Sequence, residues 1–208
     1  MIVSRLYAIV DADVLAAQGI PLAAFARELR AAGVTLLQYR DKNGSPQQVL
    51  RGAEILRDAM AGSACRLIMN DRADLAVLAN FDGVHVGQGD LSPADARRVV
   101  GPNRIVGVST HTPEQVRAAD LTSADYVAIG PVFATGTKPD ASPVVGLEGV
   151  RRARALTSKP LVAIGGITRD NARSVIDAGA DSIALISALF AANESTAQIA
   201  RDFLARLR

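Results

Sequence analysis

Two aspartates that each follow a short apolar run are the residues of this sequence that most directly suggest chemistry. Asp71 comes directly after "RLIMN", and Asp90 comes shortly after "GVHVG". Mg²⁺ is commonly held by one or two protein carboxylates, while water and phosphate oxygens complete its octahedron. If the two runs are neighbouring parallel strands, both carboxylates reach the same edge, and the pair predicts a site for Mg²⁺ and a diphosphate. Taken singly, Asp71 could instead cap the helix that follows it, and Asp90 could cap a loop.

The segment "LLQYRDK" places two cations beside an amide. Side chains alternate along a strand, so Gln38, Arg40 and Lys42 face one way, while Tyr39 and Asp41 face the other. Gln38 lies inside an apolar run, where an amide is costly unless it has a partner. We therefore interpret this strand end as part of the same anion-binding site, although solvated rim charges would give the same pattern.

Glycine follows a later apolar run. "VAIGG" ends in Gly165 and Gly166, and the next run, "SIALIS", ends in Ile186 and Ser187. Glycine lets the backbone approach an oxyanion closely, and exposed N–H groups bind its charge, so these two segments predict a phosphate cradle. A pair of plain tight turns is the ordinary alternative.

The stretch "VFATGTK" is a poor strand and a worse helix. We interpret it as part of a long loop from Gly130 to Gly146, because its glycine and the prolines behind it exclude regular structure. Its hydroxyls and its lysine would then face a ligand, and the loop could close over the site. A solvent-exposed surface loop is the alternative.

Three other reactive side chains are expected to be structural. His85 lies within a strand pattern beside two valines, which is typical of a hydrogen-bonded core histidine, and His111 would help to order the loop after its strand. Cys65 is the only cysteine, which excludes an intramolecular disulfide, and its apolar flank favours a buried thiol over a nucleophile.

The elements that must position these residues recur along the whole chain. Short apolar runs rich in β-branched residues alternate with stretches of helical character, several of which open with Ser-Pro or Thr-Pro. This order predicts parallel strands with right-handed crossovers, and eight such units close a (β/α)₈ TIM barrel that occupies residues 1–208 as one domain. An open doubly wound sheet is the alternative. The expected strands are 5–10, 34–40, 66–70, 83–87, 104–109, 125–130, 160–165 and 182–187.

Composition excludes several classes of function. The chain has 23 Lys+Arg against 21 Asp+Glu, and only 4% of its residues are aromatic, which argues against a nucleic-acid partner. No apolar stretch approaches the roughly 20 residues that span a bilayer, and the N-terminus does not have the pattern of a signal peptide, so a cytoplasmic protein without a membrane partner is expected. The oligomeric state stays open, a homo-oligomer included.

Taken together, the motifs resemble one enzyme family. "QYRDK", "NDRADLA", "DGVHVGQGD", "VGVSTH", "DYVAIGPVFATGTK", "VAIGGI" and "IALIS" match thiamine phosphate synthases in order and spacing, over about residues 5–190. The resemblance implies a Mg²⁺-dependent transferase of thiamine biosynthesis. Its small-molecule substrates would be 4-amino-2-methyl-5-(diphosphooxymethyl)pyrimidine and a thiazole phosphate, which it joins to thiamine phosphate with release of diphosphate.

The resemblance also implies roles for individual residues. Asp71 and Asp90 would hold Mg²⁺. Arg40, Lys42, Ser109 and Lys138 would be catalytic. Substrate-binding residues are expected at Gln38, Tyr39, Arg40, Asp41, Lys42, Asn70, Ser109, Thr135, Gly136, Thr137, Lys138, Gly166, Ile186 and Ser187.

Two rival functions are weighed against this one. A thiazole tautomerase on the same barrel would keep the phosphate cradle but would not need the diphosphate-binding set, which is complete here. A non-catalytic sensor of a thiamine precursor would be expected to have a degraded metal site, and both aspartates are present.

Overall fold

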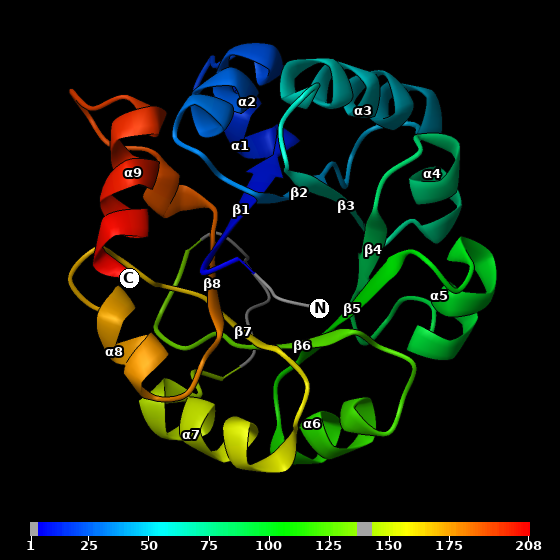
Figure 1. Cartoon of the computed structure of the whole chain (residues 1–208), viewed down its shortest axis with the longest axis vertical. Coiled ribbons are helices and arrows are strands. Elements are labelled where there is room, and N and C mark those ends of the chain that lie inside the picture. The colour runs from blue at the N-terminus through cyan, green and yellow to red at the C-terminus, as the bar shows by residue number, and fades with distance from the viewer. Residues whose placement is uncertain (1–3, 137–142) are drawn as a thin grey trace.

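Eight parallel strands close into a barrel in chain order, and helices surround it (Figure 1). The computed structural model describes residues 4–136 and 143–208. Each strand pairs with its neighbours in the chain, and β1 closes the barrel by pairing with β8, with Leu6 opposite Ile183. The strands are β1 (Leu6–Asp11), β2 (Leu36–Arg40), β3 (Arg66–Asn70), β4 (Gly83–Val86), β5 (Ile105–Thr110), β6 (Tyr126–Ile129), β7 (Leu161–Ile164) and β8 (Ser182–Leu185).

The helices pack on the outside of this barrel. A short 3₁₀ helix, η1 (Ser187–Leu189), directly follows β8. The α-helices are α1 (Ala12–Ala17), α2 (Leu22–Ala31), α3 (Pro46–Met60), α4 (Ala73–Leu78), α5 (Pro93–Val100), α6 (Pro113–Asp120), α7 (Gly146–Leu156), α8 (Ala172–Asp177) and α9 (Thr196–Arg206).

Local sequence explains where these helices begin and end. Ser45, Ser92 and Thr112 each accept a backbone N–H of the first turn of the helix that follows, and each is followed by proline. Gly33 and Gly179 follow helices with φ of 82° and 111°, a region that favours glycine. The helix starts predicted from Ser-Pro and Thr-Pro are confirmed.

The region between β1 and β2 differs from the predicted strict alternation of one strand with one helix. Two helices, α1 and α2, lie there. Asp11 ends β1 and caps α1, because its carboxylate accepts the backbone N–H groups of Asp13 and Val14. With only six residues, α1 is too short to give a helical periodicity in the sequence.

Apolar side chains fill two layers of the barrel. The larger cluster lies between the strands and the helices. A second cluster lies inside the barrel, where alternate strand residues point inward, and it includes Tyr7, Ile68, Tyr126 and Val162. The interior is therefore a packed core, and ligands are confined to its ends.

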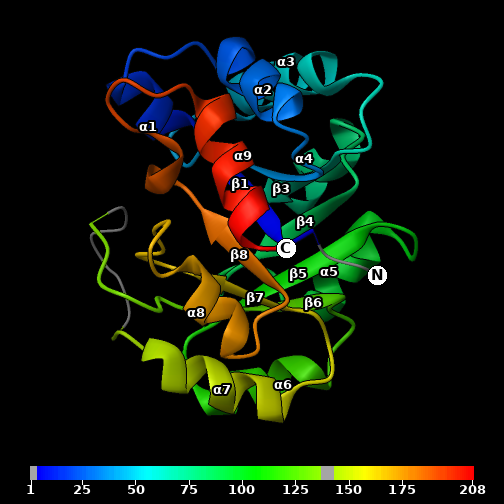
Figure 2. The same cartoon turned by 60° about the vertical axis from the view of Figure 1, so that its left-hand side comes forward.

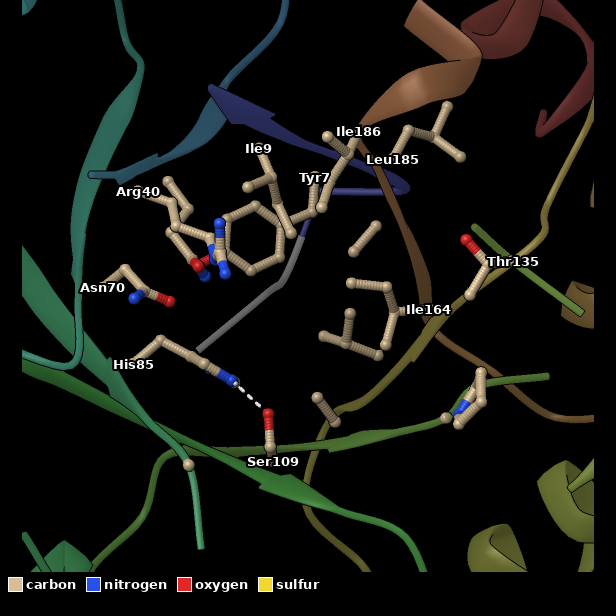
Figure 3. A pocket seen from close by; sticks show the side chains of 18 of the residues that line it. Tyr7, Ile9, Arg40, Asn70, His85, Ser109, Thr135, Ile164, Leu185 and Ile186 are labelled. Carbon is tan, nitrogen blue, oxygen red and sulfur yellow. Dashed lines mark hydrogen bonds between the residues drawn. The ribbon is translucent and has the colours of Figure 1, made fainter. Parts of the chain in front are cut away.

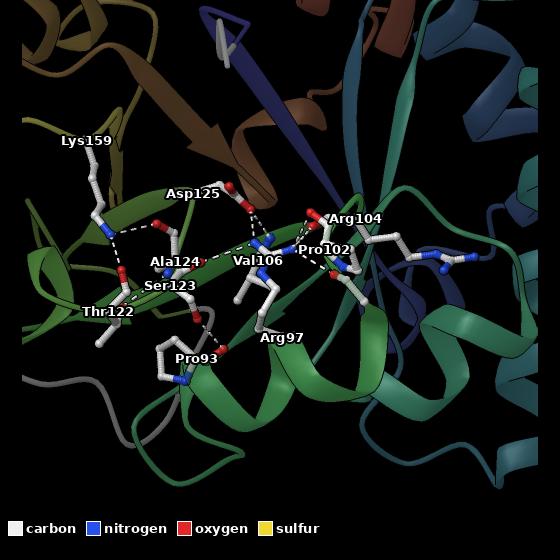
Figure 4. Close-up of polar contacts among 11 residues, drawn as sticks. Pro93, Arg97, Pro102, Arg104, Val106, Thr122, Ser123, Ala124, Asp125 and Lys159 are labelled. Carbon is white, nitrogen blue, oxygen red and sulfur yellow. Dashed lines mark hydrogen bonds and ion pairs between the residues drawn. The ribbon is translucent and has the colours of Figure 1, made fainter.

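Aspartates and arginines connect neighbouring elements at the N-terminal ends of the strands, which we call the fastened end of the barrel. In Figure 4, Arg97 of α5 donates to the carbonyl oxygen of Ser123 and pairs with the carboxylate of Asp125 at 2.5 Å. Asp125 in turn accepts the N–H of Val106 at the start of β5. The same arrangement recurs before β4 and β8. Asp82 pairs with Arg66 and accepts the N–H of Leu67. Asp181 pairs with Arg154 and accepts the N–H of Leu161.

The opposite end of the barrel carries the longer loops. Helix α1 directly follows the end of β1 and lies on the left in Figure 2, so the C-terminal ends of the strands face that side of the view. The predicted (β/α)₈ fold is confirmed. Within the described residues, no helix is long and apolar enough to cross a membrane.

Candidate active site

A pocket of about 230 Å³ opens at the C-terminal ends of the strands (Figure 3). Polar side chains of β2 to β5 form one wall, and apolar or glycine-rich segments of β7 and β8 form the facing wall. Several residues predicted from the sequence to bind substrate or metal line this pocket. They are Gln38, Arg40, Lys42, Asn70, Asp71, Asp90, Ser109, Thr135, Gly166, Ile186 and Ser187.

Arg40 is held by a buried carboxylate. It ends β2 next to Asp11 of β1, and its guanidinium forms an ion pair with Asp11. Only 3% of the Asp11 side chain and 17% of the Arg40 side chain are exposed. The same carboxylate caps α1, so one buried aspartate fixes both a helix start and the direction of the arginine.

Lys42 and two aspartates meet on the rim beside Arg40. The Nζ of Lys42 lies 2.7 Å from the Oδ2 of Asp71. Asp71 has a φ of 60°, an uncommon conformation for a residue other than glycine, and its N–H donates to the carbonyl of His85 at 2.7 Å. Helix α4 begins at Ala73 without a side-chain cap, so Asp71 is not its N-cap. The alternative structural role of Asp71 is therefore wrong.

Asp90 approaches Asp71 from the loop after β4. Its Oδ2 accepts the N–H of Gly87 at 2.8 Å, so it does order this loop, as the alternative reading of its role required. Burial raises the pKa of the Asp90 carboxyl, and the neighbouring Asp71 raises this pKa further through hydrogen bonding and like charge. A cation bound between the two carboxylates would relieve the like-charge repulsion that Asp90 experiences from Asp71.

The donor set suits Mg²⁺ more than a metal that needs a complete protein cage. Within residues 4–136 and 143–208, no group of three or more His, Cys, Asp or Glu side chains is arranged to hold a metal. Mg²⁺ needs only one or two carboxylates when water and substrate oxygens supply its other ligands. Asp71 and Asp90 therefore fit this ion, provided that a phosphate group binds beside them.

The floor of the polar wall is built from amide, imidazole and hydroxyl groups. Gln38 is buried, and its Nε2 donates to the hydroxyl of Tyr7 at 2.8 Å. His85 is also buried, and its Nε2 lies 2.8 Å from the Oγ of Ser109 (Figure 3). The expectation of a hydrogen-bonded core histidine is confirmed. His111 contacts the carbonyl of Gly130 through Nδ1 at 2.6 Å and so contributes to ordering this rim, as expected.

The facing wall depends on two glycines after β7. Gly165 and Gly166 have φ of 104° and 63°. A Cβ on Gly165 would lie 2.5 Å from the Cβ of Pro131, and one on Gly166 would lie 2.5 Å from the carbonyl oxygen of Ala134. Only glycine satisfies both the conformation and the space, so the end of β7 packs closely against residues 131–134.

Not every predicted residue reaches the pocket. Tyr39 and Asp41 lie on the opposite face of β2, where the Tyr39 hydroxyl donates to Asp41 at 3.3 Å and packs against Gly52 of α3. Burial raises the pKa of Tyr39, and nearby Asp41 raises it further. Gly136 does not line the pocket. Tyr39, Asp41 and Gly136 are therefore not supported as direct substrate contacts, and Thr137 and Lys138 lie outside the described residues.

Sequence reasoning missed three residues that support the site. Tyr7 and Tyr126 lie within apolar strand runs, and Asp11 directly follows the first run. Only the folded barrel brings these three side chains beside Gln38, His85 and Arg40. The sequence did contain a signal for Asp11, because this aspartate directly follows the first apolar run. As with Gln38, a polar group in such a position needs a partner.

Fold and site together define a class of protein: a (β/α)₈ barrel with a cationic, acidic and glycine-lined pocket suited to phosphorylated ligands. Residues 6–189 match the family model described as thiamine monophosphate synthase. The chain therefore belongs to this family, and the family predicted from the sequence motifs is confirmed.

Relatives of known name agree with this membership. The chain is 59% identical over 187 residues to the thiamine-phosphate synthase of Koribacter versatilis (strain Ellin345), covering 89% of this chain and 88% of the relative. It is 45% identical to the thiamine-phosphate synthase of Chloroflexus aurantiacus, covering 93% and 88% of the two chains. The thiamine phosphate pyrophosphorylase structure from Pyrococcus furiosus superposes with a TM-score of 0.87 at 33% identity, covering 98% of this chain and 95% of that one. At the level of the family, the predicted transferase of thiamine biosynthesis is confirmed.

Proposed function

We propose that this chain joins 4-amino-2-methyl-5-(diphosphooxymethyl)pyrimidine to a thiazole phosphate, forming thiamine phosphate and diphosphate with Mg²⁺ as cofactor. The observation that carries the proposal is the convergence of Arg40, Lys42, Asp71 and Asp90 on one wall of a single pocket. A diphosphate needs fixed cations and a metal together, and this wall offers both. A single phosphate suits the glycine-lined wall opposite.

The reaction breaks a C–O bond and forms a C–N bond. The electron pair of the C–O bond leaves with the diphosphate, and the thiazole nitrogen supplies the pair that forms the new bond to the same carbon. Negative charge grows on the leaving group as the bond breaks, so fixed positive charge stabilises the transition state more than the ground state. Arg40 and Lys42 supply that charge from this chain.

The proposed binding roles follow the two walls of the pocket. Gln38, Arg40, Lys42 and Asn70 hold the pyrimidine diphosphate, and Ser109 contacts the same substrate. Asp71 and Asp90 hold Mg²⁺, which when bound neutralises charge on the diphosphate oxygens. Gly166, Ile186 and Ser187 bind the phosphate of the thiazole, and Thr135 contacts its ring. For Thr137 and Lys138 the roles implied by the resemblance remain predictions.

A dissociative course suits the side chains of the pocket. The aminopyrimidine can stabilise a carbocation after the diphosphate leaves, and the thiazole nitrogen then captures it without giving up a proton. Such chemistry needs little help from a general base. His85 engages both ring nitrogens in short contacts within the protein, to Tyr126 and Ser109, which supports a role for it in positioning rather than in proton abstraction.

The nearest rival is a thiazole tautomerase. That reaction would need the phosphate cradle. It would not need Lys42, which pairs with Asp71, or the second carboxylate of Asp90 beside them. A binding protein without catalysis would likewise gain nothing from two carboxylates that repel each other when no metal is bound.

The proposal is tested by supplying each substrate alone and then both together, with Mg²⁺ present, while diphosphate release and the tautomeric state of the thiazole are followed. Diphosphate release that depends on the thiazole phosphate is expected. Isomerisation of the thiazole phosphate alone, without diphosphate release, would make the tautomerase the correct assignment.

A further inference from the structure

A chain of hydrogen bonds crosses the barrel beneath the pocket. The Gln38 amide lies 2.8 Å from the Tyr7 hydroxyl, which lies 2.9 Å from the Tyr126 hydroxyl. Tyr126 lies 2.9 Å from the Nδ1 of His85, and the Nε2 of His85 lies 2.8 Å from the Oγ of Ser109. Four strands besides β2 thus contribute one side chain each to a continuous path that ends at a pocket-lining hydroxyl.

The path has a direction that follows from its donors. The Nε2 of Gln38 can only donate, so the oxygen of Tyr7 accepts. A tyrosine hydroxyl carries one proton, and among residues 4–136 and 143–208 the other hydrogen-bond partner of the Tyr7 hydroxyl is Tyr126, so Tyr7 donates to Tyr126. By the same reasoning Tyr126 donates to the Nδ1 of His85. The neutral imidazole then carries its proton on Nε2 and donates it to Ser109.

Burial keeps both tyrosines in the protonated form that this path needs. Tyr126 is fully buried, and Tyr7 is 1% exposed. Burial raises the pKa of both phenols, because an anion would be poorly solvated in the barrel interior. Each hydroxyl therefore keeps its proton to donate.

The backbone of β5 makes room for this arrangement. Gly107 lies opposite Tyr126 in the strand register, and a Cβ at Gly107 would lie 2.0 Å from the Cζ of Tyr126. The Tyr126 ring therefore extends across β5 and stacks on the His85 ring with centroids 5.5 Å apart. A larger residue at position 107 would displace Tyr126 from His85.

We propose that Tyr126, supported by Tyr7 and Gln38, is a positioning residue that holds His85 as the Nε2–H tautomer and so fixes the hydroxyl of Ser109. Because Ser109 accepts from His85, its own proton is directed into the pocket. The ligand must then present an acceptor to Ser109, such as a ring nitrogen or a phosphate oxygen. This inference rests on the proposed function only for the identity of that ligand.

The test is the ¹⁵N spectrum of the histidine side chains in the substrate-free protein. The chain has 2 histidines, so His111→Asn assigns the signals of His85. At a pH where His85 is neutral, we expect Nε2 protonated and Nδ1 unprotonated in the wild type. In Tyr126→Phe the Nδ1 nitrogen loses its donor, and we expect a mixture of tautomers together with a fall in kcat of about tenfold.

Tyr7→Phe is the matched variant, since it also removes one buried hydroxyl but leaves the Tyr126 donor in place. We expect it to keep the Nε2–H tautomer. A protonated Nδ1 in the wild type, or unchanged His85 signals in Tyr126→Phe, would overturn the proposal. The spectra are recorded without substrate, so they test this inference independently of the proposed function. If the protein shows the expected tautomer but makes no thiamine phosphate, the proposed function is contradicted and this inference stands.

Discussion

The Nζ of Lys42 lies 2.7 Å from the Oδ2 of Asp71, so a cation proposed for the diphosphate is held by a carboxylate proposed for Mg²⁺. The contact couples the two halves of the anion-binding wall. A metal that bound to Asp71 would compete for the carboxylate and release Lys42 towards the leaving group, which ties the position of the lysine to the occupancy of the metal site.

The first prediction concerns Lys42→Met. Its pair is partly exposed, with 47% of the Lys42 side chain accessible, and such pairs contribute about 0–1 kcal/mol to the free energy of unfolding. We expect unfolding by urea to change little, while kcat falls by about 100-fold because a transition-state cation is lost. Arg72→Met is the control: it breaks the surface pair with Asp74 at 2.6 Å on a residue that does not line the pocket. Equal kcat in the two variants would contradict the role of Lys42.

The second prediction concerns Asp11→Asn. The amide oxygen can still accept the N–H groups that cap α1, but the partly buried Arg40 loses its counter-charge. Leaving one member of a buried ion pair alone costs about 3–5 kcal/mol, so the free energy of unfolding should fall by about that amount. Asp13→Asn, which changes an exposed aspartate of the same helix, should cost less than about 1 kcal/mol. A similar loss in both variants would mean that Arg40 does not depend on Asp11.

The third prediction concerns Asp90→Asn and Mg²⁺. Burial, followed by Asp71, raises the pKa of Asp90 in the folded state, so the contribution of this carboxyl to the free energy of unfolding is fully present below its ordinary pKa. That contribution is lost as the pH rises through the raised pKa, where the carboxyl must ionise. Without Mg²⁺, the asparagine variant should therefore melt no lower than the wild type at neutral pH.

Addition of Mg²⁺ separates the two proteins further. The ion should raise the melting temperature of the wild type at neutral pH, and this rise should shrink as the pH falls and the Asp90 carboxyl is protonated. Asp90→Asn should show a much smaller rise. An equal rise with Mg²⁺ in the variant, measured by differential scanning fluorimetry, would place the ion elsewhere.

The fourth prediction concerns the fastened end of the barrel. Asp125→Ala removes the acceptor for the N–H of Val106 and leaves Arg97 without its carboxylate. We expect the free energy of unfolding to fall by about 2 kcal/mol, while kcat and KM stay unchanged because the site lies at the other end of the strands. Arg98→Ala on the same helix, which breaks an exposed pair at 3.3 Å, serves as control. A changed KM in Asp125→Ala would argue that the two ends of the barrel are coupled.

Sequence patterns predicted the strands well because each is a short apolar run with polar or glycine boundaries. The run 66–70 matches β3 at both ends, and the run 182–187 extends two residues past the end of β8, where η1 begins. Helix α1 was missed because its start depends on the buried Asp11, a tertiary feature that periodicity does not report.

The site was predicted less completely, for a reason that lies in the strand register. Strand alternation alone correctly placed Arg40 and Lys42 in the pocket and Tyr39 and Asp41 outside it, whereas the family resemblance had included all four. Asp11 reaches Arg40 on the neighbouring strand, and Tyr126 of β6 reaches past β5 to His85 of β4. Their contacts depend on which residues pair, and a single sequence does not specify that pairing.

The central claim is that this pocket makes thiamine phosphate from two phosphorylated substrates. Its most direct test is to incubate the purified chain with the pyrimidine diphosphate, the thiazole phosphate and Mg²⁺, and to quantify the products by mass spectrometry. Thiamine phosphate and diphosphate should form in equal amounts, and excess EDTA should stop both. Absence of thiamine phosphate from the complete mixture would contradict the claim.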